Sequence, residues 1–212
     1  MSTDVVTTVD ILRHGQTQAD DILRGRIDIP LSELGYQQMH DRLAPFIASS
    51  DNRPAAPWQQ VISSPLQRCA AFSHDLAEQH GSAIEIDAGF LEMNFGDWDG
   101  RPFHELKKED PDLFHRVWSQ PHKYNPPNGE DFQQFYQRIS TAWESLLQQY
   151  SGKHVLLVCH GGVIRALLGH IMQTPLTSLS RIDVPYACLS RVKVYHQQGQ
   201  EPWPQLVFHN HH

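Results

Sequence analysis

Two arginines and two histidines in this sequence have the residue types that phosphoryl chemistry uses. Arg13 and His14 are adjacent, Arg68 ends the stretch SSPLQR, and His160 begins the stretch HGG. A guanidinium group presents paired donors that match phosphate oxygens, and an imidazole can act as a nucleophile, a donor or a proton carrier. Each histidine taken alone also fits a hydrogen-bonded structural role. The four residues together indicate a site for a phosphate or phosphoryl group.

Glycines accompany these residues at the same points of the sequence. Gly15 follows His14, and Gly161 and Gly162 follow His160. A glycine lets the backbone approach a ligand closely, and a helix that begins near Val163 would offer free N–H groups to an anion. We therefore expect Gly161 and Gly162 to contribute to substrate binding.

A carboxyl group is available in the stretch LEMNFGDWDG. Glu92 ends an apolar approach, and Gly96 and Gly100 occupy expected turn positions. A carboxyl group beside a phosphate pocket could protonate a departing oxygen, which typically accelerates a reaction 10²–10⁴-fold. The alternative is a solvated glutamate on the surface.

Short apolar segments precede all three of the histidine and arginine motifs. Val9–Leu12, Val61–Ser63 and His154–Cys159 are rich in β-branched residues and are typical of buried parallel strands. Ligands bind at the carboxyl ends of such strands, so the motifs should meet at one edge of a sheet. Weaker strand signals lie at Ile84–Ile86, Leu189–Tyr195 and Leu206–Phe208.

Helical patterns alternate with these strands. The expected helices run from a cap at Ser32 toward Phe46, from Pro65 to about His80, over about Phe132–Tyr150 and over Val163–Ile171. Alternation of strands and helices predicts an α/β fold: a three-layer sandwich with a mostly parallel central sheet flanked by helices. The least regular segment, about residues 99–130, reads as an excursion laid over the site.

Length and composition restrict the class of protein. The 212 residues suit a single domain, residues 1–212, and 40% apolar and 19% charged residues are ordinary for a soluble enzyme. No apolar run approaches the roughly 20 residues of a membrane-spanning helix. A net charge of −7 disfavours nonspecific binding to nucleic acid, which depends on a basic surface.

The cysteines and the first residues bear on cellular location. Cys69, Cys159 and Cys188 are odd in number and lack metal-type spacing, which argues against a disulfide framework. The opening stretch MSTDVVTTVD has neither the basic patch nor the long apolar region of a signal peptide. We expect a cytoplasmic protein. The sequence leaves the oligomeric state open, with a homodimer as one option.

Five motifs in order resemble those of the histidine phosphatase superfamily, the phosphoglycerate-mutase-like enzymes. They are LRHGQT, GRIDIPLSELGYQQM, ISSPLQRC, LEMNFGDWDG and LLVCHGGVIR. The resemblance implies that His14 is the nucleophile, that Arg13, Arg68 and His160 hold the phosphoryl oxygens, and that Glu92 is the proton donor. It implies a phosphohistidine intermediate, a small-molecule phosphomonoester substrate, and neither metal nor cofactor.

Within the superfamily, the pattern is most similar to that of α-ribazole phosphatases. The segment after His14 carries two departures from many relatives: Gln16 replaces the commoner glutamate, and Asp20 stands where an asparagine touches the phosphate. A carboxylate there would repel a dianion unless it turns away, and Arg24 and Arg26 are candidates to compensate its charge.

Aromatic residues of the excursion are candidates to bind a planar base such as the benzimidazole of α-ribazole phosphate. They are Phe103, Trp118 and Tyr124, with His104 and His122 beside them. Core packing under a long excursion is the alternative for each aromatic residue.

The leading hypothesis is therefore a phosphatase that dephosphorylates α-ribazole 5′-phosphate in the assembly of the cobalamin nucleotide loop. A broad-specificity or sugar-phosphate phosphatase and a phosphoglycerate mutase are the enzymatic alternatives. An inactive module that binds a phosphorylated ligand is the alternative from another class. Retention of His14 and Glu92 weighs against it.

Overall fold

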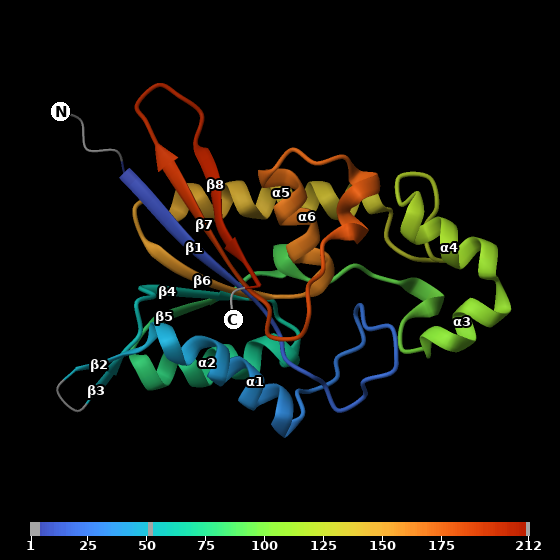
Figure 1. Cartoon of the computed structure of the whole chain (residues 1–212), viewed down its shortest axis with the longest axis horizontal. Helices are drawn as coiled ribbons and strands as arrows, with labels where there is room; N and C mark the ends of the chain where they lie inside the picture. Colours follow the sequence, from blue (N-terminus) through green and yellow to red (C-terminus); the bar gives the residue numbers. More distant parts are fainter. Residues whose placement is uncertain (1–4, 51–52, 211–212) are drawn as a thin grey trace.

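A computed structural model describes residues 5–50 and 53–210, and a six-stranded mixed sheet dominates it (Figure 1). The strand order is β5-β4-β6-β1-β7-β8. Neighbours from β5 to β1 pair in parallel, and β7 is antiparallel to both β1 and β8. The strands are β1 (Val5–Arg13), β4 (Gln60–Ser63), β5 (Ala83–Ile86), β6 (His154–Cys159), β7 (Leu189–His196) and β8 (Trp203–His209), with β2 (Ala48–Ser50) and β3 (Arg53–Ala55) forming a separate pair.

Helices cover both faces of the sheet, which confirms the predicted three-layer α/β architecture. In Figure 1, α1 and α2 lie on one side of the sheet and α5 and α6 on the other. The α-helices are α1 (Glu33–Leu43), α2 (Gln67–His80), α3 (Phe103–Glu109), α4 (Pro111–Ser119), α5 (Phe132–Gln149) and α6 (Gly161–Ile171). Short 3₁₀ turns are η1 (Ala44–Phe46), η2 (Ala88–Phe90), η3 (Gly96–Trp98) and η4 (Leu176–Arg181). None of the helices in the described part of the chain combines the length and apolar character needed to cross a membrane.

Two apolar cores, one on each face, explain the continuously apolar strands. Successive side chains of a strand point to opposite faces, so Ile11 packs with α5 and α6 while Leu12 packs with α1 and α2. On β6, Leu157 and Val158 divide in the same way, and all of these side chains are fully buried. Burial on both faces is what the sequence pattern of the central strands predicts.

The predicted helices are present with small shifts at their ends. Helix α1 ends at Leu43, and the chain as far as Phe46 forms η1, because Pro45 has no N–H for the next helical hydrogen bond. Helix α6 begins at Gly161 rather than at Val163. This earlier start places both glycines of the HGG motif in the first helical turn.

The excursion at about residues 99–130 is more regular than the sequence indicates, since it contains α3 and α4. Asp110 caps α4 by accepting a hydrogen bond from the N–H of Leu113, and Pro111 occupies the first position of the helix. The ring of Trp98 packs against Phe114, with their centroids 5.8 Å apart. In Figure 1, α3 and α4 lie beyond the end of the sheet rather than on one of its faces.

The carboxyl ends of the three central strands meet as predicted. Arg13 at the end of β1 is paired in register with Cys159 at the end of β6, and Ser63 at the end of β4 is paired with Val158. The N–H of His14 donates to the carbonyl of Cys159 at 3.0 Å. The first and second histidine motifs are therefore joined through the backbone.

The segment after β1 is held by a close contact with α1. A Cβ atom on Gly15 would lie 2.1 Å from the carbonyl oxygen of Gly35, and one on Gly35 would lie 2.0 Å from the carbonyl oxygen of Gln16. A glycine is therefore needed at position 15 because α1 packs closely against this segment. The sequence suggests another reason, the close approach of a ligand to the backbone.

We predict that Gly35→Ala destabilises the protein although alanine is the better helix former. Alanine in a helix interior normally gains about 1 kcal/mol over glycine, whereas a methyl group forced against the backbone of Gln16 costs about 1–3 kcal/mol. Urea unfolding measures the difference. Gln37→Ala, on the exposed side of the same helix, is the control and should change stability by less than about 0.5 kcal/mol. A more stable Gly35→Ala protein would contradict the packing argument.

Candidate functional site

A cavity of about 340 Å³ lies where the motifs meet. Its lining comes from the segment after β1, the Glu92 loop, α3, α4, the start of α6 and the loop before β7. The lining residues are Arg13, His14, Asp20, Ile22, Leu23, Arg24, Glu92, Phe95, Phe103, Trp118, Gly161, Gly162, Arg165 and Tyr186. We call this the catalytic cavity.

His14 is a buried imidazole with one nitrogen engaged. Its Nδ1 lies 2.8 Å from the carbonyl oxygen of Gly15, which can only accept, so Nδ1 carries the proton. Burial, together with the guanidinium groups of Arg13 and Arg68, holds the pKa of His14 well below its usual range. The ring is therefore neutral at physiological pH, and its Nε2 keeps a lone pair for attack.

Arg13 lies beside His14 and is held by the loop before β7. Its Nη1 donates to the carbonyl oxygen of Val184 at 2.6 Å, and its guanidinium carbon lies 4.4 Å from the centre of the Tyr186 ring. Its buried Nε has no partner in the described structure. An anion in the catalytic cavity would supply the acceptor that this side chain lacks.

Arg68 and His160 form a fully buried pair behind the catalytic cavity. Arg68 donates from Nη1 to the carbonyl of Ile27 and from Nη2 to that of Gly25, each at 2.8 Å. Its Nε lies 3.3 Å from Nδ1 of His160, whose Nε2 is 2.7 Å from Oγ of Ser64. Both ring nitrogens of His160 are thus engaged with protein groups, and this ring orients Arg68.

The electrostatic state of His160 follows from the same burial. Desolvation and the adjacent Arg68 guanidinium hold the pKa of His160 well below its usual range. Its ring centre is 5.3 Å from that of His14, in an edge-to-face arrangement. Two neutral imidazoles and two guanidinium groups give the region a net positive charge.

Glu92 is fixed against the first turn of α6. Its Oε2 accepts from the N–H of Gly162 at 2.9 Å, and its Oε1 accepts from the N–H of Met93 at 3.0 Å. A Cβ atom on Gly162 would lie 2.3 Å from Oε1 of Glu92. Gly162 therefore holds the carboxyl group of Glu92, and it lines the catalytic cavity together with Gly161.

Neighbouring side chains stabilise the negative charge of Asp20. Its Oδ1 accepts from the hydroxyl of Tyr186 at 2.5 Å and its Oδ2 from the side-chain amide of Gln16 at 2.7 Å, while Arg24 lies 3.8 Å away. The Tyr186 and Gln16 hydrogen bonds lower the pKa of Asp20. Gln16 therefore stabilises the Asp20 carboxylate through a hydrogen bond. Arg24 donates a further hydrogen bond to the Tyr186 hydroxyl.

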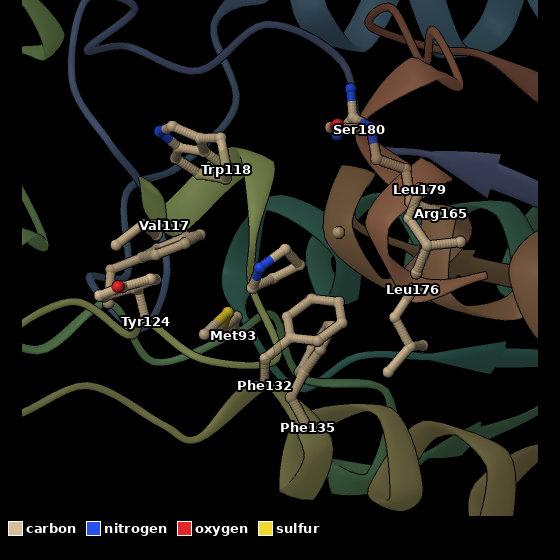
Figure 2. Close-up of a pocket in the computed structure, with 13 residues that line it drawn as sticks. Met93, Val117, Trp118, Tyr124, Phe132, Phe135, Arg165, Leu176, Leu179 and Ser180 are labelled. Carbon is tan, nitrogen blue, oxygen red and sulfur yellow. The ribbon is translucent and has the colours of Figure 1, made fainter. Parts of the chain in front are cut away.

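The remaining candidates divide between the catalytic cavity and other places. Phe103 and Trp118 line the cavity as predicted. Arg26 does not: its Nη2 lies 3.7 Å from Oε2 of Glu130, so compensation of Asp20 falls to Arg24. Tyr124 lines a smaller neighbouring cavity instead (Figure 2).

Tyr186 and Arg165 are site residues that the sequence analysis missed. Tyr186 lies in a loop with no recognisable pattern, and only the fold brings it against Arg13. Arg165 ends the stretch LLVCHGGVIR, one turn into α6, where its Nε donates to the carbonyl of Ile182 at 2.9 Å. A basic residue one helical turn after the two glycines was the available signal for Arg165.

A family model for the histidine phosphatase superfamily (branch 1) matches residues 9–203. The chain belongs to the histidine phosphatase superfamily. It is 32% identical over 191 residues to "Bifunctional protein Rv2228c" of Mycobacterium tuberculosis, covering 89% of this chain and 50% of that protein. The chain thus spans about half the length of that relative.

Two further relatives extend over most of their own length. An adenosylcobalamin/α-ribazole phosphatase of Salmonella typhimurium is 28% identical over 190 residues, covering 87% of this chain and 89% of that protein. The crystal structure of a putative α-ribazole-5′-P phosphatase from Escherichia coli has a TM-score of 0.78 and 25% identity, covering 97% and 96% of the two chains. This histidine phosphatase superfamily member has the phosphoglycerate-mutase-like fold.

We predict that the His14 ring titrates at a lower pH than an unperturbed histidine and that its neutral form carries the proton on Nδ1. The depressed pKa follows from burial and from the two guanidinium groups. An unperturbed histidine, with a pKa near 6.5, is about 90% protonated at pH 5.5. Long-range ¹H–¹⁵N NMR reports both the tautomer and the charge of each ring. His14→Asn identifies the signal, and free histidine in the same buffer is the control. A midpoint near pH 6.5 at His14, or a proton on Nε2, would contradict the derived state.

Proposed function

We propose that this protein hydrolyses phosphomonoesters through a phosphohistidine on His14. The observation that carries the proposal is the hydrogen bond from Nδ1 of His14 to the Gly15 carbonyl, which leaves Nε2 to attack. Nucleophilic attack divides a difficult displacement into two easier ones.

The first step transfers the phosphoryl group to the enzyme. Nε2 of His14 forms a bond to phosphorus as the ester P–O bond breaks, and the departing oxygen takes a proton from Glu92. Arg13 neutralises charge on the phosphoryl oxygens, the buried Arg68 adds positive potential behind them, and the neutral His160 holds Arg68 in place. We propose that Arg13, Arg68 and His160 contact the phosphoryl group directly when the substrate is bound.

The second step returns the enzyme to its starting state. Water loses a proton to Glu92 and attacks phosphorus, the P–N bond breaks, and its electron pair returns to Nε2 of His14. The products are inorganic phosphate and an alcohol. Glu92 suits both roles because two backbone N–H groups fix its carboxyl group in position.

We further propose α-ribazole 5′-phosphate as the substrate, in cytoplasmic assembly of the cobalamin nucleotide loop. The Salmonella relative carries the name of this activity. Support from the site comes from Phe103 and Trp118, which give the catalytic cavity an aromatic wall of the kind that stacks on planar bases. In this proposal the excursion at about residues 99–130, with α3 and α4, selects the alcohol.

Two kinds of alternative function remain. One kind has the same phosphoryl chemistry with a different alcohol, and the other has no catalytic activity. A sugar-phosphate or broad-specificity phosphatase and a phosphoglycerate mutase use the same phosphoryl site with a polar alcohol. A related protein of Yersinia pestis is named a probable phosphoglycerate mutase, at 27% identity over 197 residues. An inactive phosphate-binding module would show no turnover of any ester.

Steady-state assays with four esters separate these functions. We expect kcat/KM for α-ribazole 5′-phosphate to exceed that for fructose bisphosphate and 3-phosphoglycerate at least tenfold, with p-nitrophenyl phosphate as the generic reference. Stacking of a base on the aromatic wall is worth about 1–3 kcal/mol, or roughly 5- to 160-fold. Phe103→Leu should remove most of this preference without a similar loss on 3-phosphoglycerate, which has no ring to stack. Equal rates on all esters would leave the phosphatase chemistry intact and reject the α-ribazole assignment.

A further inference from the structure

A second, mostly apolar cavity opens beside the catalytic cavity (Figure 2). It has a volume of about 70 Å³ and is enclosed by α4, α5, α6 and η4. Figure 2 shows Trp118, Tyr124, Phe132 and Phe135 on one side of it and Arg165, Leu176 and Leu179 on the other. We call this the apolar subsite.

The two cavities share part of their lining. Phe95, Trp118, Gly162 and Arg165 border both of them. Trp118 and Phe95 are in contact, with ring centres 5.9 Å apart, so a single aromatic wall continues from one cavity to the other. A molecule in the catalytic cavity can therefore extend along this wall.

The position of Glu92, the proposed proton donor, determines the direction in which a bound substrate extends. Glu92 is bound to the N–H of Gly162, the glycine that borders both cavities, and Met93 directly after it lines the apolar subsite. The ester oxygen must lie near Glu92 to receive its proton, with the phosphoryl group on the side of His14. The carbon attached to that oxygen then points toward Met93 and the apolar subsite.

The subsite is built to receive an apolar group. Met93, Val117 and Phe135 are almost completely buried, yet together they leave space between them. A cavity lined mainly by apolar side chains favours an apolar occupant, because a polar group would lose hydrogen bonds to water there. Its volume is about twice the roughly 30 Å³ that one water molecule occupies in the liquid, and about half that of an apolar cavity that holds benzene.

We infer that the alcohol of the substrate carries a small apolar substituent, of about two or three carbons, that enters this subsite. The inference rests on the proposed phosphatase reaction and specifies its substrate class: esters of alcohols with an alkyl group or a methylated ring edge near the reacting oxygen. Polyhydroxylated alcohols are disfavoured, because hydroxyl groups buried among these side chains would lose their hydrogen bonds to water.

A series of n-alkyl phosphates tests the subsite directly. From methyl to n-propyl phosphate we expect kcat/KM to rise about three- to fourfold per methylene, the gain for a buried CH₂, and to level off beyond n-butyl. Glycerol 3-phosphate, with the same three-carbon skeleton as n-propyl phosphate, should be at least tenfold poorer. A flat series in the wild-type enzyme would show a packing void and overturn the inference.

Variants of the lining place the effect in this cavity. Leu176→Phe fills the space, and the ratio of kcat/KM for n-butyl over methyl phosphate should fall to about one. Leu34→Phe, the same change at an exposed position of α1, is the matched control and should keep the wild-type ratio. Val117→Ala enlarges the cavity, so the best chain should become longer by one or two carbons. An unchanged chain-length profile in both lining variants would overturn the inference.

The test also separates this inference from the α-ribazole assignment. If α-ribazole phosphate is no better than sugar phosphates while the alkyl series keeps its rise, the subsite stands and the assignment fails. If α-ribazole phosphate is preferred and the alkyl series is flat, the assignment stands and the subsite fails.

Discussion

The parallel pairing of β1 with β6 is the interaction on which the site depends. It aligns Arg13 with Cys159, so that the residues that follow each strand, His14 and His160, leave the sheet side by side. The hydrogen bond from the N–H of His14 to the carbonyl of Cys159 continues the ladder by one more residue. A shift of one residue in this register would turn one imidazole away from the other, because successive side chains point to opposite faces.

Burial then determines the chemistry of the groups that this pairing brings together. Removal from water penalises charge on an imidazole, and the neighbouring guanidinium groups add to that penalty, so both rings are neutral. The arginines remain charged because a guanidinium group does not lose its proton in a protein. Backbone carbonyls of Gly25, Ile27 and Val184 accept their hydrogen bonds. The result is a neutral nucleophile in a positive environment, which suits attack on a phosphate dianion.

Much of this arrangement could be predicted from sequence because it depends on local patterns. The central strands are short apolar runs with the chemically active residues directly at their ends, so β1, β4 and β6 were predicted correctly. His14 and Glu92 line the catalytic cavity, where the sequence pattern placed them. Tyr186 could not be predicted, because an irregular loop carries it to Arg13 and no spacing encodes that contact. Arg26 was wrongly expected at Asp20, since sequence proximity does not reveal its contact with Glu130.

The excursion at about residues 99–130 is a second region whose structure could not be predicted from sequence patterns alone. Its helices α3 and α4 are only 7 and 9 residues long, too short to give a strong period. Packing of Phe114 and Trp118 against Trp98 and Phe95 holds α4 in place. The aromatic residues there are recognisable in the sequence. Their division between the catalytic cavity and the apolar subsite depends on tertiary structure alone.

Trapping the covalent intermediate tests the central claim, that neutral His14 is the nucleophile, most directly. The wild-type enzyme, quenched in base during turnover of a radiolabelled ester, should carry an acid-labile, base-stable phosphoryl group on the peptide that contains His14. His14→Ala should carry none and lose turnover, whereas His74→Ala, a change on the exposed side of α2, should be labelled like the wild type. Undiminished turnover by His14→Ala, or a label on another residue, would contradict the account.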